Sequence, residues 1–112
     1  MALGVTLALR YLRGGRIPIP GVVHGLVGAA GFGLLIVALR GPRRSDAMGV
    51  GSFGIVALVL FGIALTLGPF IPPLTRRAPR FAGLLLAVHA TVAITAYVLF
   101  LAWASIGQAA SR

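Results

Sequence analysis

The stretch Ala47–Leu67, with the sequence AMGVGSFGIVALVLFGIALTL, carries no charged side chain. At a helical rise of about 1.5 Å per residue it extends about 31 Å, which is close to the thickness of the hydrocarbon core of a bilayer. The stretch therefore predicts a helix that spans a membrane.

Two further uncharged runs flank this one, at residues 17–39 and 81–111. A membrane crossing needs about 20 mostly apolar residues, so each run is long enough for one helix. We expect helices at about 20–39, 47–67 and 81–107. The first connection is short, which favours antiparallel neighbours. The sequence thus predicts an all-α integral membrane protein whose residues 17–112 form a bundle of three transmembrane helices.

Prolines mark the ends of the expected helices. Because proline disfavours the helical conformation in the residue before it, we expect an extended chain up to Ile19 and a first helix that begins at Pro20. The linker of residues 68–80, GPFIPPLTRRAPR, contains four prolines and is expected to be irregular. Trp103, near the end of the third helix, suits the headgroup boundary, where amphipathic rings collect.

Residues 1–16 form a segment of their own, with apolar and polar residues on opposite sides of a helix. The apolar side has Leu3, Leu7 and Tyr11, and the other has Thr6, Arg10 and Arg13. This pattern is typical of a short amphipathic helix on a membrane surface. A frayed, solvated N-terminus is the alternative.

The composition excludes an ordinary soluble domain. Of the 112 residues, 59% are hydrophobic and 10% are charged, and the formal net charge is +9. The basic residues are all arginines at the ends of apolar runs, where lipid phosphates supply the counter-charge. We therefore expect the lipid bilayer, and no nucleic acid, as a partner. The absence of cysteine excludes disulfides and iron–sulfur ligation.

The distribution of arginines predicts the orientation. Arg10, Arg13, Arg16, Arg76, Arg77 and Arg80 fall on one side of the expected bundle, and Arg40, Arg43, Arg44 and Arg112 on the other. The positive-inside rule then places the N-terminus inside. Because the basic residues are arginines and none is lysine, we expect the membrane to be a bacterial inner membrane.

Small residues predict a contact face on the first helix. Helices in lipid associate by close van der Waals packing, which small side chains permit. Gly21, Gly25, Ala29 and Gly33 recur at intervals of four residues. This ridge is expected to contact other membrane subunits or a second copy of the chain. The alternative is that glycine and alanine are simply frequent in membrane helices.

Two histidines are the polar residues of the spans that draw attention to function. Threonine hydroxyls can bond a carbonyl of their own helix, but an imidazole has no such local partner. His24 lies about four residues inside the first expected helix and His89 about nine residues inside the third, or roughly 6 and 13 Å along their axes. Because these helices would be parallel, both imidazoles are expected in the same half of the bilayer, on the side with more arginines, and a tilt of the long third helix would bring their depths closer.

The surroundings of the histidines favour a haem b site. A macrocycle bound edge-on between two helices needs an axial nitrogen from each, small residues beside them and cations for its carboxylates. His24 and His89 would be the axial ligands. Gly28 and Gly31 follow His24, and Ala93 and Ala96 follow His89, at helical spacing. Arg16 and Arg80 would bind the propionates. The alternative is that both histidines are neutral hydrogen-bond partners of each other, of a carbonyl or of a neighbouring protein.

Two strings carry a resemblance to a known family: HGLVGAAGFGLL, residues 24–35, and LLAVHATVAITAYVLF, residues 85–100. They resemble the haem-bearing helices of small bacterial membrane b-type cytochromes. The resemblance implies electron transfer through haem b to a quinone or a partner subunit. Many such cytochromes have four helices and two histidine pairs, whereas this chain has three helices and one pair, which implies a single haem.

Three other functions are open. The first is a non-catalytic accessory or assembly subunit of a larger respiratory or photosynthetic membrane complex. The second, transport, ranks lower because no span contains a carboxylate. The third, an enzyme, is disfavoured because the chain shows no acid–base pair and no nucleophile with a base at suitable spacing.

Overall fold

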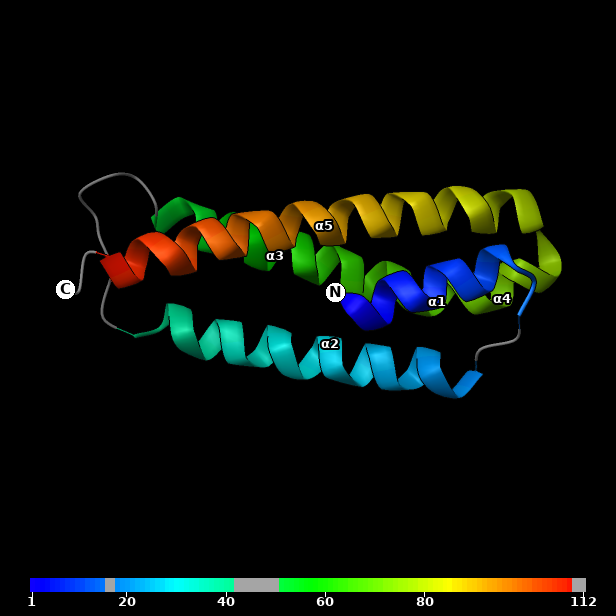
Figure 1. Cartoon of the computed structure of the whole chain (residues 1–112), viewed down its shortest axis with the longest axis horizontal. Helices are drawn as coiled ribbons and strands as arrows, with labels where there is room; N and C mark the ends of the chain where they lie inside the picture. The colour runs from blue at the N-terminus through cyan, green and yellow to red at the C-terminus, as the bar shows by residue number, and fades with distance from the viewer. Residues whose placement is uncertain (16–17, 42–50, 110–112) are drawn as a thin grey trace.

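The computed structural model describes residues 1–15, 18–41 and 51–109, and in these ranges it is a bundle of helices. The elements in chain order are α1 (Ala2–Leu12), α2 (Pro18–Leu39), α3 (Gly51–Leu67), the 3₁₀ turn η2 (Gly68–Phe70), α4 (Ile71–Arg77) and α5 (Pro79–Ala109). The molecule is elongated, with extents of 50 × 22 × 19 Å. In Figure 1 the first turns of α2 and α5 lie toward one end of the long axis and the first turn of α3 toward the other.

Within the described ranges, three helical segments are long and apolar enough to cross a membrane: Ile19–Leu39, Gly51–Arg77 and Pro79–Ile106. Their outer faces expose large apolar side chains, for example Leu26 at 66% and Leu34 at 71%. Water would not tolerate such continuous apolar surfaces. The three helices are therefore consistent with an integral membrane protein, as the sequence predicts.

The helix boundaries differ from the expected ones near the prolines. Helix α2 begins at Pro18, so Ile19 is helical and not extended. A proline in the first turn of a helix loses no hydrogen bond, because the first amides have no partner within the helix. Residues 47–50, expected in the second span, lie outside the described residues.

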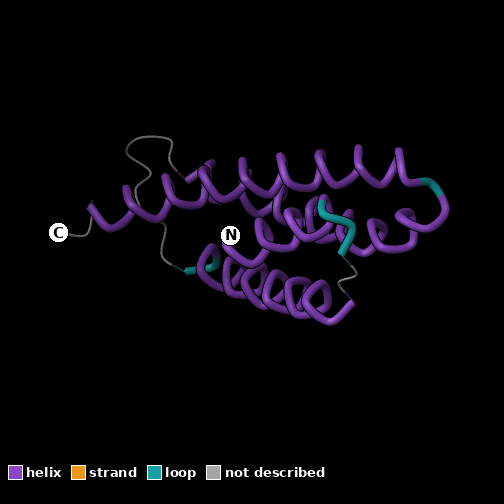
Figure 2. Tube along the Cα trace, turned by 45° about the vertical axis from the view of Figure 1, so that its right-hand side comes forward, coloured by secondary structure: helices purple, strands orange, loops and turns teal. Residues whose placement is uncertain are grey.

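The linker of residues 68–80 is also helical, and the expectation of an irregular chain was wrong. Its prolines fall at the starts of η2, α4 and α5, where the missing amide matters least. Only Ala78, with φ of −150° and ψ of 75°, interrupts the helical path before α5. Figure 2 shows this single loop between the two helical segments.

The expected amphipathic segment contains α1, which ends before Gly14. Gly14 has a φ of 74°, a left-handed conformation that suits glycine after a helix. Figure 1 shows α1 beside the other helices, roughly along the long axis of the bundle. Its position at a membrane surface stays a prediction, and Arg16 lies outside the described residues.

The core forms mainly between α3 and α5, through buried small residues. Ala57, Ala82 and Ala96 are completely enclosed. Trp103, which we expected at the headgroup boundary, is enclosed by the bundle and only 6% exposed. It forms an apolar cluster with Leu35 of α2, and Gly54 of α3 makes room for its ring. The close fit of small residues follows from packing as the main attraction between helices in lipid.

Candidate functional site

The structure brings the two histidines together. The ring centroids of His24, on α2, and His89, on α5, lie 6.3 Å apart with an interplanar angle of 77°. Their residue numbers differ by 65, so only the folding of the bundle makes them neighbours. Both side chains are partly buried. Two imidazoles thus meet inside a chain whose spans are otherwise almost wholly apolar.

His89 is held in place by a backbone carbonyl of α3. Its Nδ1 lies 2.9 Å from the carbonyl oxygen of Ala64. Because a carbonyl oxygen only accepts hydrogen bonds, Nδ1 carries the proton and donates it. In the neutral ring, Nε2 then keeps a free lone pair. Such an orienting bond from the remote ring nitrogen is usual for a histidine that ligates a metal.

Two glycines permit the close approach of backbone to the imidazoles. A Cβ atom built on Gly4 of α1 would lie only 3.1 Å from Cε1 of His24. A Cβ on Gly68, in η2, would lie 3.5 Å from Cε1 of His89. Helix α1 therefore covers the ring of His24, and η2 borders the ring of His89.

From the sequence we did not expect Gly4, Gly68 or the carbonyl of Ala64 at this site. A signal for Gly4 exists, because it shares a helix face with Leu7, Ala8 and Tyr11, and this face is partly buried. A carbonyl group is present at every residue, so nothing in the sequence marks the one at Ala64.

The threonines of the spans have local partners, as expected. The hydroxyls of Thr66, Thr91 and Thr95 donate to carbonyl oxygens three or four residues earlier in their own helices, at 2.8 to 2.9 Å. These bonds satisfy the hydroxyls without any ligand. The histidine pair is therefore left as the chemically distinctive feature of the described spans.

The small residues expected beside a macrocycle have different surroundings. A Cβ on Gly28 would lie 3.8 Å from Leu65 of α3, whereas Gly31 has open space around it. Ala96 is fully buried and Ala93 is partly buried. Arg80 is exposed at the start of α5. Of the two glycines, Gly31 is the one with open space, and it lies seven residues after His24 on an exposed part of α2.

The described residues offer few side chains that could ligate a metal ion. Among the described residues, no group of three or more histidine, cysteine, aspartate or glutamate side chains could hold a metal ion. The pair offers two imidazole nitrogens, which suits a metal whose remaining positions are filled by another ligand, such as the four nitrogens of a porphyrin.

Comparisons with known proteins do not assign a family or a function to this chain. No protein-family model, no curated protein and no solved structure matches this chain significantly. The site is therefore interpreted from its own geometry.

Proposed function

We propose that this membrane protein binds one haem b between α2 and α5, with His24 and His89 as axial ligands, and carries electrons to a quinone or a partner subunit. The observation that carries the proposal is the pair of imidazoles with centroids 6.3 Å apart. Imidazole nitrogens are common ligands of haem iron, and this pair would supply one nitrogen from α2 and one from α5.

The donor chemistry of the pair also fits haem iron. The bond from His89 to Ala64 leaves Nε2 of His89 as the free nitrogen. When bound, haem supplies an iron that gains and loses single electrons, with a potential that depends on its axial ligands and its burial. The protein's part is to orient the imidazoles and to exclude water from them. Arg16 and Arg80 are proposed for the propionates, because guanidinium groups form charge-assisted bonds with carboxylates.

We further propose that the protein lies in a bacterial inner membrane, with antiparallel neighbouring spans and its N-terminus on the inner side. The count of arginines supports this orientation, because Arg10 and Arg13 precede the first span while Arg76 and Arg77 end the second. The ridge of Gly21, Gly25, Ala29 and Gly33 is proposed as a contact with other subunits or a second copy.

An absorption spectrum tests the haem proposal directly. The chain, purified in a mild detergent after expression with supplied haem, should be coloured, and dithionite should change its visible spectrum. His24→Ala and His89→Ala should each lose most of this signal. Thr91→Val is the matched control, because it removes a polar group of α5 that bonds only its own helix.

Two results would overturn the proposal. One is an intact, haem-supplemented protein that stays colourless. The other is a spectrum that survives in both histidine variants unchanged.

A second candidate function is an accessory or assembly subunit, favoured by the open face of α2. A Cβ atom on Gly21, Gly25 or Gly33 would meet nothing within 4 Å, and Ala29 is exposed. Gly25→Leu or Gly33→Leu should release the protein from its complex after mild solubilisation. Gly31→Leu is the control, because Gly31 is equally open but lies on another side of α2. Wild-type protein that runs as a clean monomer contradicts this role.

A further inference from the structure

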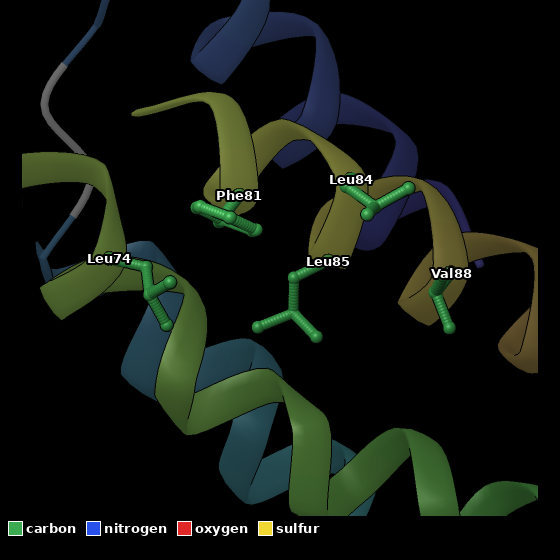
Figure 3. A pocket seen from close by; sticks show the side chains of 5 residues that line it. All are labelled: Leu74, Phe81, Leu84, Leu85 and Val88. Atoms are coloured by element: carbon green, nitrogen blue, oxygen red, sulfur yellow. The ribbon is translucent and has the colours of Figure 1, made fainter. Parts of the chain in front are cut away.

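The corner between α4 and α5 contains an open apolar groove of about 270 Å³. Its lining consists of Leu74, Phe81, Leu84, Leu85 and Val88. Figure 3 shows Leu74 on α4 facing Phe81 and Leu85 on α5 across the groove. Phe81 is 66% and Leu84 is 63% exposed, so the groove opens outward. All five lining side chains are hydrocarbon, which suits an acyl chain and offers no partner for polar groups.

A basic hollow of about 320 Å³ lies on the same short helix. Pro72, Pro73, Arg76 and Arg77 line it. Leu74 of the groove and Arg77 of the hollow are three residues apart and therefore neighbours on the surface of α4, so the apolar groove and the basic hollow adjoin. Both arginines are exposed and stand at the end of the second apolar segment, Gly51–Arg77, where lipid headgroups would lie.

The described chain offers no carboxylate to these arginines. The single acidic residue of the sequence is Asp46, which lies outside the described residues. Guanidinium groups bind phosphate through paired, charge-assisted hydrogen bonds. The counter-charge for Arg76 and Arg77 is therefore best supplied by a phosphate from outside the described chain.

We infer that this corner binds one anionic phospholipid, with an acyl chain in the groove and its phosphate at Arg76 and Arg77. A soluble anion would make no use of the apolar groove, and a neutral lipid would leave the two adjacent cations without a net counter-charge. The inference uses neither histidine, so it is independent of the proposed haem.

Native mass spectrometry tests the lipid site on the full chain in a neutral detergent. The probe is an equal mixture of phosphatidylglycerol and phosphatidylcholine with the same acyl chains. We expect one phosphatidylglycerol to be retained in preference. Arg77→Gln should weaken its retention about fivefold, and the double variant with Arg76→Gln by more than tenfold, given the usual contribution of a basic residue near anionic lipid. Arg40→Gln, at an exposed arginine after α2, is the matched control and should leave retention unchanged.

A second pair of variants tests the groove. Leu84→Trp should obstruct the acyl chain and reduce retention severalfold. Leu101→Trp makes the same change at an exposed position of α5 outside the groove and should not. Glycerol phosphate, which has no acyl chain, should not displace the lipid at equal concentration.

Equal retention of the two lipids would overturn the inference, as would an equal loss in Arg40→Gln or no loss in Leu84→Trp. Displacement by glycerol phosphate would show a site for a free anion instead. Should Leu84→Trp fail to fold, the comparison of the two lipids and of Arg77→Gln with Arg40→Gln decides the question.

Discussion

Two regions of the bundle are held together by different chemistry. Around Trp103 the helices are held by close van der Waals packing, because the indole lies against Leu35 and against the backbone of Gly54, which has no side chain. Around His89, the imidazole bonds a carbonyl and faces a second imidazole. In lipid, close packing holds helices together, whereas polar groups are costly and are usually kept for function. The comparison therefore separates a region that stabilises the fold from a region that is suited to chemistry.

Removal of the indole should have the largest effect on stability. Trp103→Ala leaves a cavity that the neighbouring helices cannot fill, and we expect a loss of about 3 kcal/mol in the free energy of unfolding. Denaturation by dodecyl sulfate in mixed micelles, followed by circular dichroism, measures it. Tyr97→Ala is the control, since Tyr97 is 37% exposed on the same helix. Equal losses in the two variants would mean that the packing around Trp103 has no special role.

A methyl group at Gly54 should have the next largest effect. The new Cβ would lie 2.8 Å from Cδ2 of Leu39 and 3.0 Å from Nε1 of Trp103. Overpacking of this kind costs about 2 kcal/mol. The same denaturation assay measures Gly54→Ala against Gly33→Ala, which meets open space and should be neutral or slightly stabilising because alanine favours a helix. A tolerated Gly54→Ala would show that the helices separate easily here.

The smallest effect is expected for a substitution in α1, the helix that covers the ring of His24. Gly4→Ala brings a Cβ to 3.1 Å from the ring of His24, so α1 must shift by a few tenths of an ångström. The shift should loosen α1 and raise the rate of tryptic cleavage after Arg10 and Arg13 about twofold, since cleavage follows local opening. Thr6→Ala is the control, because its hydroxyl bonds only Ala2 of the same helix. An unchanged rate in Gly4→Ala would mean that α1 is not held by this contact.

The number and type of the long helices could be predicted from the sequence. Uncharged runs between arginines are sufficient, because a bilayer demands a minimum length and a low polarity. The helix boundaries near the prolines could not be predicted from the sequence. Pro18 and Pro72 are compatible both with an extended chain and with the first turn of a helix, and the sequence does not say which.

The two histidines could be singled out from the sequence, because a span rarely contains imidazole. The structure places their rings side by side, whereas their role as ligands stays a prediction. The bond from His89 to Ala64 and the approach of Gly4 were not predicted. They depend on the rotation of α5 against α3 and on the path of α1 after Gly14, which arise from contacts between residues distant in sequence.

The sequence alone determined that the chain forms apolar helices of membrane-spanning length, because hydrocarbon excludes charge and leaves a backbone no partner but itself. Only the tertiary structure decided which faces of those helices meet. Almost every face is apolar, so hydropathy does not distinguish them, and the fit of side chains such as Trp103 against Gly54 selects the arrangement that also brings the two imidazoles together.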